Sequence, residues 1–270
     1  MNISHFHCTT LSDSWYQLVF NLMRNDDVPK NVYQIQKGSY VGQKRLEYEF
    51  VIVQIDHPGE MPLIPEIPPH LNIPPPVESM DYVEEYFANY LMNPELERNE
   101  TYRYSSWLEP GVRRVIEQLK GVPGNNQAAI SIGGWSPSAN FHYNSKETSE
   151  GIGRFTDTDN FIDPGTGQRD PACLRVCDFR LDQNNTLHMF VYFRSWDLGS
   201  GYSANLAGLQ MLKSYVAQEI GAKDGKIIAA SKGLHIYDHY IQVAAVRLGM
   251  ENVDSMDNFL DYIESEKIDK

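Results

Sequence analysis

Two neighbouring runs of strand-forming residues give the strongest constraint on how this 270-residue chain can fold. Residues 174–181 and 187–193 are rich in apolar and aromatic side chains, and turn-forming residues occupy positions 182–185 between them. This pattern predicts two adjacent strands joined by a short turn, and therefore a sheet in the second half of the chain.

Apolar residues at helical spacing mark the segments that are expected to pack on such a sheet. The spacing predicts helices at residues 15–23, 81–92, 111–120, 204–220 and 236–248. Residues 32–55 and 226–230 are expected to form further strands. Seven prolines between residues 61 and 77 favour an extended connector, because proline lacks the N–H that a helix needs. Residues 133–169, rich in small polar residues, are expected to form a long surface excursion.

Composition excludes several classes of protein. A formal charge of −13 argues against broad affinity for nucleic acid, which requires lysines and arginines gathered on one surface. The apolar runs are too short to cross a bilayer, and the N-terminal residues lack the basic start and apolar stretch of a signal peptide. We therefore expect a cytoplasmic protein that binds neither nucleic acid nor membranes, with its three cysteines as free thiols.

The first candidate for chemistry is Cys173, at the start of the predicted strand pair. Alternation along a strand would place Cys173, Arg175 and Cys177 on one face. An arginine beside a thiol favours the thiolate, which is the reactive form. The same pattern also fits two ordinary core cysteines and a surface arginine. Zinc ligands at the usual spacings are not evident, so no metal is expected.

Two later segments carry polar residues that suit a nucleotide. Arg194 and Ser195 can bind a phosphate, and Asn205 offers both a donor and an acceptor to the edge of a base. A salt-bridged strand end and a helix cap would explain the same residues equally well. His235 and Tyr237 follow the last predicted strand, where they can reach a sugar hydroxyl or form a packed aromatic pair.

The order and spacing of these three segments together resemble thymidylate synthases. The resemblance is carried by Pro171-Ala172-Cys173, by Arg194-Ser195-Trp196-Asp197 with Asn205 eight residues after the aspartate, and by His235-Ile236-Tyr237. It is strongest over residues 170–248. In the first half of the chain, Gly38-Ser39-Tyr40, Arg45-Leu46-Glu47 and Asn126-Gln127-Ala128 resemble the branch that is typical of methanogenic archaea.

The resemblance implies a fold and a reaction. It implies an α+β fold in a single domain over residues 1–270, with helices on one face of a mixed sheet and a second subunit of a homodimer on the other. It also implies methylation of the pyrimidine nucleotide dUMP at ring carbon 5 to give dTMP. The one-carbon donor would be a reduced pterin, either methylene-tetrahydrofolate or methylene-tetrahydromethanopterin, without a metal.

The resemblance also assigns catalytic roles. Cys173 corresponds to the nucleophile that adds to ring carbon 6, and this addition makes carbon 5 reactive towards the one-carbon unit. Asp197 corresponds to a residue near the base and the pterin, and Tyr104 to an active-site tyrosine. Glu84, or its neighbour Glu85, corresponds to the catalytic glutamate that moves protons through ordered water.

The remaining roles concern substrate binding. By resemblance, Arg194 and Ser195 hold the phosphate, Asn205 reads the base, and His235 and Tyr237 hold the 3′-hydroxyl of the sugar. The sequence departs from the family at two places. Leu174 follows the nucleophile where the family usually has histidine, and Asn126-Gln127 stands where most members have two arginines for the partner's phosphate. Arg175, Lys44 and Arg45 are candidates to replace those arginines.

Two other functions stay open at this point. A hydroxymethylase of the same family would act on dUMP, dCMP or CMP and add water in place of hydride. Asn205 favours uracil, because cytosine presents an amino donor and an unprotonated ring nitrogen that suit an aspartate. An amide can rotate, however, so Asn205 alone does not forbid cytosine. A non-catalytic nucleotide-binding relative would keep Arg194 and Asn205 without requiring Cys173.

Overall fold

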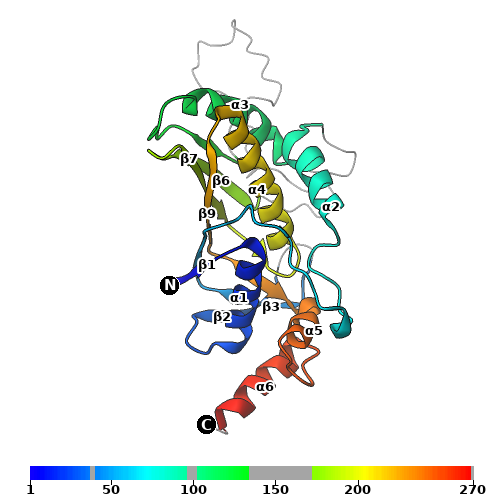
Figure 1. Ribbon diagram of the computed structural model, residues 1–270. Helices are drawn as coiled ribbons and strands as arrows, with labels where there is room; N and C mark the ends of the chain where they lie inside the picture. The colour runs from blue at the N-terminus through cyan, green and yellow to red at the C-terminus, as the bar shows by residue number, and fades with distance from the viewer. Residues whose placement is uncertain (37–39, 96–101, 134–171, 269–270) are drawn as a thin grey trace, which may run out of the picture.

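The computed structural model of the chain describes residues 1–36, 40–95, 102–133 and 172–268, and it combines helices with two sheets (Figure 1). The helices are α1 (Leu11–Arg24), the short η1 (Pro69–Leu71), α2 (Met80–Glu85), the π-helical η2 (Tyr86–Met92), α3 (Ser105–Leu119), α4 (Gly201–Ile220), α5 (Asp238–Arg247) and α6 (Met256–Ile268). The strands are β1 (Ser4–Cys8), β2 (Lys30–Gln34), β3 (Lys44–Tyr48), β4 (Val51–Ile55), β5 (Ala129–Ser131), β6 (Leu174–Leu181), β7 (Thr186–Phe193), β8 (Trp196–Asp197), β9 (Lys223–Ser231) and β10 (Leu234–Tyr237).

Both sheets are mixed. The larger one has six strands in the order β1-β4-β9-β7-β6-β5, with β1 parallel to β4 and β7 parallel to β9. The smaller one has four strands in the order β2-β3-β10-β8, in which β10 runs parallel to β8 and antiparallel to β3. The predicted mixed sheet is thus present as two sheets, and the smaller one carries the last of the three motif segments.

The two faces of the larger sheet differ in how far they are covered. Along β7, Leu187, Met189, Val191 and Phe193 are buried, whereas Phe190, on the opposite face, keeps 39% of its surface exposed. Helix α4 packs on β7 and β9 and lies beside them in Figure 1. Burying alternate apolar residues of a strand under a helix accounts for this difference.

A β-bulge interrupts the alternation of side chains at the start of β6, where the sequence predicted a regular strand. The register of β6 against β7 shifts between Leu174 and Val176, so one residue of β6 has no counterpart. Leu174 and Cys177 are both fully buried, while Cys173 is half-buried. Cys173 and Cys177 are therefore not equivalent positions on one face of a regular strand, as the spacing had predicted, and only Cys173 retains access to solvent.

Most of the predicted elements are present, some with shifted ends. The helix predicted at 111–120 begins earlier, at Ser105, and the helix predicted from residue 236 begins at Asp238 because 234–237 form β10. The strands β1 and β5 and the helix α6 were not predicted. Pro171, Gly38, Ser39 and nearly all of the predicted excursion at 133–169 lie outside the described residues. In the described ranges, none of the helices has both the length and the apolarity to span a membrane.

Candidate active site

Arg194 ties the end of β7 to the segment that carries Cys173. The backbone N–H of Arg194 donates to the carbonyl oxygen of Cys173 at 2.9 Å, and its Nε donates to the carbonyl oxygen of Ala172 at 3.2 Å. The guanidinium group is thereby tied to the backbone of the residue before the half-buried Cys173. The other two cysteines are buried in the core, where burial raises the pKa of Cys8 to about 12 and that of Cys177 further. Cys173 is therefore the thiol best placed to react with a ligand.

Tyr104, just before α3, approaches the same segment from the other side. Its hydroxyl accepts a hydrogen bond of 3.3 Å from the backbone N–H of Leu174, the residue after Cys173. The side chain is buried, and burial holds the pKa of Tyr104 well above its usual value. Tyr104 is therefore a neutral group that keeps its own proton for donation. The sequence resemblance implies an active-site tyrosine here, and the structure places the hydroxyl of Tyr104 against the residue that follows Cys173.

The second and third motif segments meet where β10 pairs with β8, just after the turn between β9 and β10. His235 pairs with Asp197 in the parallel register of β10 and β8, and the N–H of Leu198 donates to the carbonyl oxygen of His235 at 2.7 Å. Gly233 makes this approach possible, because a Cβ at that position would lie 3.0 Å from the carbonyl oxygen of Arg194. The Cα of the half-buried Ser195 would lie 3.4 Å from the same Cβ position.

His235 is a buried imidazole with one nitrogen that has no partner. Its Nδ1 donates to the carbonyl oxygen of Gly233 at 2.8 Å, which fixes the proton on Nδ1 because a carbonyl only accepts. Burial lowers the pKa of His235 to about 4, so the ring is neutral near pH 7. Its Nε2 is therefore an acceptor, and it has no hydrogen-bond partner among the described residues. A buried acceptor of this kind is expected to bind a donor from a ligand or from water.

Tyr237 is the last residue of β10, and its ring packs against that of His235. Its ring centroid is 4.4 Å from that of His235 and 4.7 Å from that of Tyr40. Burial, reinforced by the charge of Asp197, raises the pKa of Tyr237 to about 12, and the charge of Arg45 opposes this rise. Tyr237 is thus a neutral hydroxyl that can donate and accept beside the unpartnered nitrogen of His235.

Arg45 is the cation closest to this pair in the smaller sheet. In the antiparallel register of β3 and β10 it lies opposite Tyr237, and Glu47 lies opposite His235. The Nε of Arg45 donates to Oε2 of Glu47 at 2.7 Å, and Glu47 is buried. Burial raises the pKa of Glu47 although Arg45 lowers it. A carboxylate under Arg45 fixes the guanidinium group in place.

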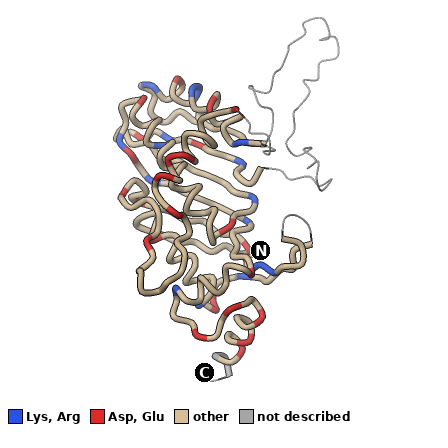
Figure 2. Tube along the Cα trace, turned by 90° about the vertical axis from the view of Figure 1, so that its right-hand side faces the viewer, with Lys and Arg blue, Asp and Glu red and all other residues tan. Residues whose placement is uncertain are grey.

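The other two phosphate candidates lie in different settings. Lys44 forms an ion pair with Asp257 of α6, and the tube in Figure 2 shows several red, acidic positions along this helix. Arg175 is half-buried at the β-bulge, and its carbonyl oxygen accepts from the N–H of Ile132 at 2.8 Å. Arg175 is close to Cys173 in sequence, whereas Lys44 is held towards α6.

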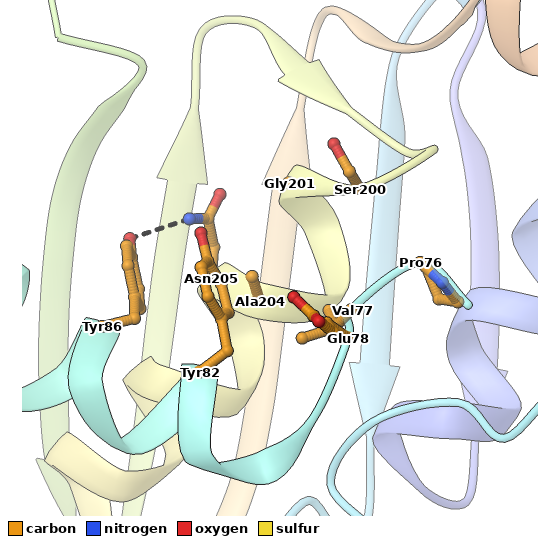
Figure 3. A pocket seen from close by; sticks show the side chains of 9 residues that line it. All are labelled: Pro76, Val77, Glu78, Tyr82, Tyr86, Ser200, Gly201, Ala204 and Asn205. Atoms are coloured by element: carbon orange, nitrogen blue, oxygen red, sulfur yellow. Dashed lines mark hydrogen bonds between the residues drawn. The ribbon is translucent and has the colours of Figure 1, made fainter. Parts of the chain in front are cut away.

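A cavity of about 200 Å³ opens beside the second motif segment (Figure 3). It is lined by Pro76, Val77, Glu78, Tyr82, Tyr86, Ser200, Gly201, Ala204 and Asn205. Its volume is below the roughly 300–1,000 Å³ typical of sites for drug-sized ligands, so it suits a single ring better than a whole nucleotide. Asn205 projects from α4 and donates from Nδ2 to the hydroxyl of Tyr86 at 2.8 Å, the bond drawn in Figure 3. Its Oδ1 accepts from Nε1 of Trp196 at 3.0 Å.

Three tyrosine rings connect this cavity to the segment of Cys173. Tyr86 stacks on Tyr90 with ring centroids 5.3 Å apart, and Tyr90 meets Tyr104 edge-on at 5.4 Å. Tyr86 and Tyr90 lie in η2, and π-helical turns are frequent at functional sites. Gly208 of α4 leaves room for the ring of Tyr86 against this helix, since a Cβ at position 208 would lie 2.7 Å from that ring. The sequence analysis missed Tyr82 and Tyr86, although tyrosines four apart on one helix face were visible.

The predicted glutamates are not at this cavity. Glu84 and Glu85 are exposed on α2, and neither lines the cavity, whereas Glu78, two residues before α2, does. Asp197 is half-buried, and its two oxygens accept from the N–H of Gly199 at 2.8 Å and from the hydroxyl of Ser200 at 2.7 Å. Asp197 therefore shapes the loop that leads to α4.

The structure thus joins most of the predicted site residues through these contacts and leaves Glu84 outside. The residues that it joins are Cys173, Tyr104, Arg194, Ser195, Asp197, Asn205, His235, Tyr237 and Arg45. Across the described ranges, His, Cys, Asp and Glu side chains form no group of three or more that could hold a metal ion. Among these residues, Cys173 is a half-buried thiol on the segment that Arg194 bonds, Asn205 lines the cavity, and His235 has a buried acceptor without a partner in the described part of the chain.

Comparison with known proteins specifies the class further. The thymidylate synthase family model matches residues 164–264. The chain is 27% identical to a provisionally assigned thymidylate synthase of Methanosarcina barkeri over 236 residues, which cover 85% of this chain and 88% of that protein. It is 42% identical over 67 residues to a provisionally assigned thymidylate synthase of Methanococcoides burtonii, covering 25% of this chain and 30% of that protein. The thymidylate synthase of varicella-zoster virus is 37% identical over 78 residues, covering 29% of this chain and 26% of that protein.

These matches confirm the resemblance found in the sequence. Residues 164–264, which contain Cys173, Arg194, Asn205 and His235, match the thymidylate synthase family model. The similarity to proteins of Methanosarcina and Methanococcoides agrees with the predicted likeness to the methanogen branch.

Proposed function

We propose that the protein is a thymidylate synthase that converts dUMP to dTMP, with Cys173 adding to carbon 6 of the pyrimidine. The observation that carries this proposal is that the three motif segments converge: Arg194 bonds the backbone of Cys173, and Leu198, next to Asp197, bonds that of His235. The enzyme class follows from the family, whose members transfer one-carbon units.

The proposed chemistry begins at the thiol. Arg194 favours the thiolate of Cys173, and formation of the S–C6 bond moves the ring electrons towards the oxygen at position 4. The N–H of Asn205 is placed to stabilise that charge, which grows in the transition state. Carbon 5 then bonds to the one-carbon unit and loses its proton to a base. The bond between the one-carbon unit and the pterin nitrogen would then break, and a hydride supplied by the pterin would add to that carbon as the S–C6 bond breaks and returns the thiolate of Cys173.

The cavity as it stands is too small for a pyrimidine and a pterin together, but two of its lining residues suit one edge and one face of the implied one-carbon donor. A pterin ring presents amino and ring N–H groups, which suit the carboxylate of Glu78, and its flat face suits the ring of Tyr82. When bound, the reduced pterin supplies the methylene carbon and the hydride. We propose Glu78 in place of Glu84 or Glu85 as the carboxylate that handles protons through water, because Glu78 is the one that lines the cavity.

The sugar and phosphate are proposed to bind at the other end of the site. The 3′-hydroxyl of the sugar donates to Nε2 of His235, which supplies the missing partner of that nitrogen. The hydroxyl of Tyr237 accepts from or donates to the same group. Arg194 and Ser195 bind the phosphate, and Arg45, fixed by Glu47, supplies a further cation in place of the two arginines that the sequence lacks. Arg175 is the alternative source of that charge.

The decisive experiment incubates the protein with dUMP and methylene-tetrahydrofolate and reads the product by mass spectrometry and dihydrofolate absorbance. The proposal predicts the mass gain of a methyl group together with dihydrofolate. A mass gain of a hydroxymethyl group would instead identify the protein as the hydroxymethylase. Binding of nucleotide without turnover, also with methylene-tetrahydromethanopterin, would indicate the non-catalytic relative.

We also propose that the chain forms one domain and a homodimer in the cytoplasm. The buried apolar residues from Cys8 to Phe259 form one continuous core, and the three free thiols suit a reducing compartment. The open face of the larger sheet offers an apolar surface, where Phe190 and Ile228 are neighbours and are 39% and 36% exposed. Sedimentation should show a dimer that Phe190→Asp converts to monomer, and a monomeric wild type would reject the proposal.

A further inference from the structure

Asn205 is held from both ends within the protein. Its Oδ1 accepts from Trp196 Nε1 at 3.0 Å and its Nδ2 donates to the hydroxyl of Tyr86 at 2.8 Å. An amide has two acceptor sites on its oxygen and two N–H donors on its nitrogen. Each end of Asn205 therefore keeps one position for a ligand, and both positions belong to a side chain that lines the cavity.

Trp196 decides which way round this amide lies. An indole nitrogen only donates, so the atom of Asn205 that faces it must be the oxygen. Tyr86 does not decide the orientation, because a hydroxyl both donates and accepts. The orientation of the amide thus follows from the chemistry of one neighbour.

Trp196 itself has little freedom to move. It is 3% exposed, stacks on Phe193 with ring centroids 3.9 Å apart and planes at 7°, and lies 4.5 Å from the ring of Tyr202. Its backbone N–H donates to the carbonyl oxygen of Gly233 at 2.8 Å. The indole N–H therefore points at Asn205 before any ligand arrives.

We infer that Trp196 is a positioning residue that sets base specificity, by holding the amide of Asn205 in the orientation that reads uracil and rejects cytosine. This inference rests on the proposed function, because it assumes that a pyrimidine nucleotide binds with its edge towards Asn205. It removes the ambiguity that rotation of a free amide would leave.

The hydrogen-bonding pattern of the two bases explains the selection. Uracil presents N3–H as a donor and O4 as an acceptor, which complete the free positions on Oδ1 and Nδ2. Cytosine presents the reverse, an unprotonated N3 and an amino donor. To bind cytosine, Asn205 would have to rotate, and its Nδ2 would then face the indole N–H of Trp196. Two donors would meet, and a buried N–H would lose its acceptor.

The test measures the dissociation constants of dUMP and dCMP by calorimetry at a pH where both bases are neutral. For the wild type we expect dUMP to bind at least about tenfold more tightly, which corresponds to about 1.4 kcal/mol. Trp196→Phe keeps an aromatic ring between Phe193 and Tyr202 but removes the N–H, so water can take its place and the amide can rotate. We expect the ratio in this variant to fall to within about threefold.

Tyr86→Phe is the matched control. It removes the hydroxyl at the other end of Asn205 and leaves Trp196 in place, so both nucleotides should bind more weakly while the wild-type ratio is kept. A merely structural role of Trp196 would weaken both nucleotides equally in Trp196→Phe and leave the ratio unchanged. Melting curves of both variants check that they fold.

The possible outcomes separate the two levels of the argument. If the wild type binds neither nucleotide, the proposed function fails. If the wild type prefers dUMP and Trp196→Phe keeps that preference, the role of Trp196 is rejected while the proposed function stands. If Trp196→Phe does not fold, Tyr86→Phe still decides, because loss of the preference in that variant would show that Tyr86 sets the orientation.

Discussion

Asn205 and His235 present polar atoms at two ends of the same site, and they differ in how those atoms are satisfied. Both ends of the Asn205 amide are bonded to fixed aromatic side chains of the protein. At His235, Nδ1 is bonded to Gly233, while Nε2 is buried without a partner among the residues described. The end that we propose to read the base is thus ordered by the chain itself, whereas the end that we propose to hold the sugar keeps an acceptor for a ligand. On the proposed function, selectivity arises at the first end and ligand-dependent stability at the second.

The largest effect is expected at the thiol between these two ends. Cys173→Ser should lower turnover by several orders of magnitude, because a serine hydroxyl is a far weaker nucleophile than a thiolate. Nucleotide binding should be largely kept, since both ends remain intact. Steady-state kinetics and calorimetry on the same preparation measure the two quantities. Full activity in this variant would remove Cys173 from the proposed role.

The next effect concerns the carboxylate at the base end. Glu78→Gln should reduce turnover by about 10²–10⁴, the usual contribution of a general acid or base. Glu84→Gln, on the exposed part of α2, should have little effect by comparison. Measuring kcat for both variants under the same conditions decides between the position given by the cavity and the one given by the sequence. The reverse result would restore Glu84.

The dependence of stability on pH should report the buried imidazole of the sugar end. The pKa of His235 is about 4 in the folded protein and about 6.5 when unfolded, so between these values the unfolded chain binds the extra proton. Stability from this residue is complete above pH 6.5 and is lost as pH falls towards 4, by a few kcal/mol at most. Denaturant titrations of wild type and His235→Phe measure it as their difference.

Comparing with the variant is necessary because neighbouring groups titrate as well. Glu47, whose pKa is raised by burial, acts in the opposite direction, and the charges of Asp197 and Arg45 act on the imidazole. A difference between wild type and variant that does not change with pH would show that His235 is not a buried neutral group.

The smallest effects distinguish the two ends most directly. Asn205→Leu should destabilise the protein without ligand by about 1–3 kcal/mol, because the buried N–H of Trp196 loses its acceptor. His235→Phe should cost less than about 1 kcal/mol near pH 7, because the carbonyl oxygen of Gly233, which loses the imidazole, still accepts a hydrogen bond from the backbone N–H of Trp196. With saturating dUMP, the wild type should gain stability that His235→Phe gains only in part. Equal losses in both variants would contradict the comparison.

The sequence predicted the elements and motifs of this site better than its internal contacts. Residues 174–181 form β6 as predicted, because the apolar pattern and the following turn are local signals. The bulge that separates Cys173 from Cys177 is not visible in a pattern of alternating residues. Spacing and resemblance singled out Asn205 and His235 for their capacity to form hydrogen bonds, and the structure shows which protein groups each of them bonds.

Contacts between distant segments were beyond the reach of the sequence. The partner of Asn205, Tyr86, is 119 residues away, and no local pattern relates the two. Burial of His235 depends on its place between β3 and β8, so neither its neutral state nor its free Nε2 was predictable. The sequence pointed to Glu84 or Glu85 and not to Glu78, because which side chains of α2 and of the residues before it line the cavity depends on packing against α4.

Gly233 lies at the contact between the segment that carries Arg194 and the one that carries His235. The segment after β7 approaches the turn between β9 and β10 closely at position 233, where a Cβ would lie 3.0 Å from the carbonyl oxygen of Arg194. An alanine there would require a shift of a few tenths of an ångström in one of the two segments. The spacing between the segments of Arg194 and His235 is therefore sensitive to a single methyl group at position 233.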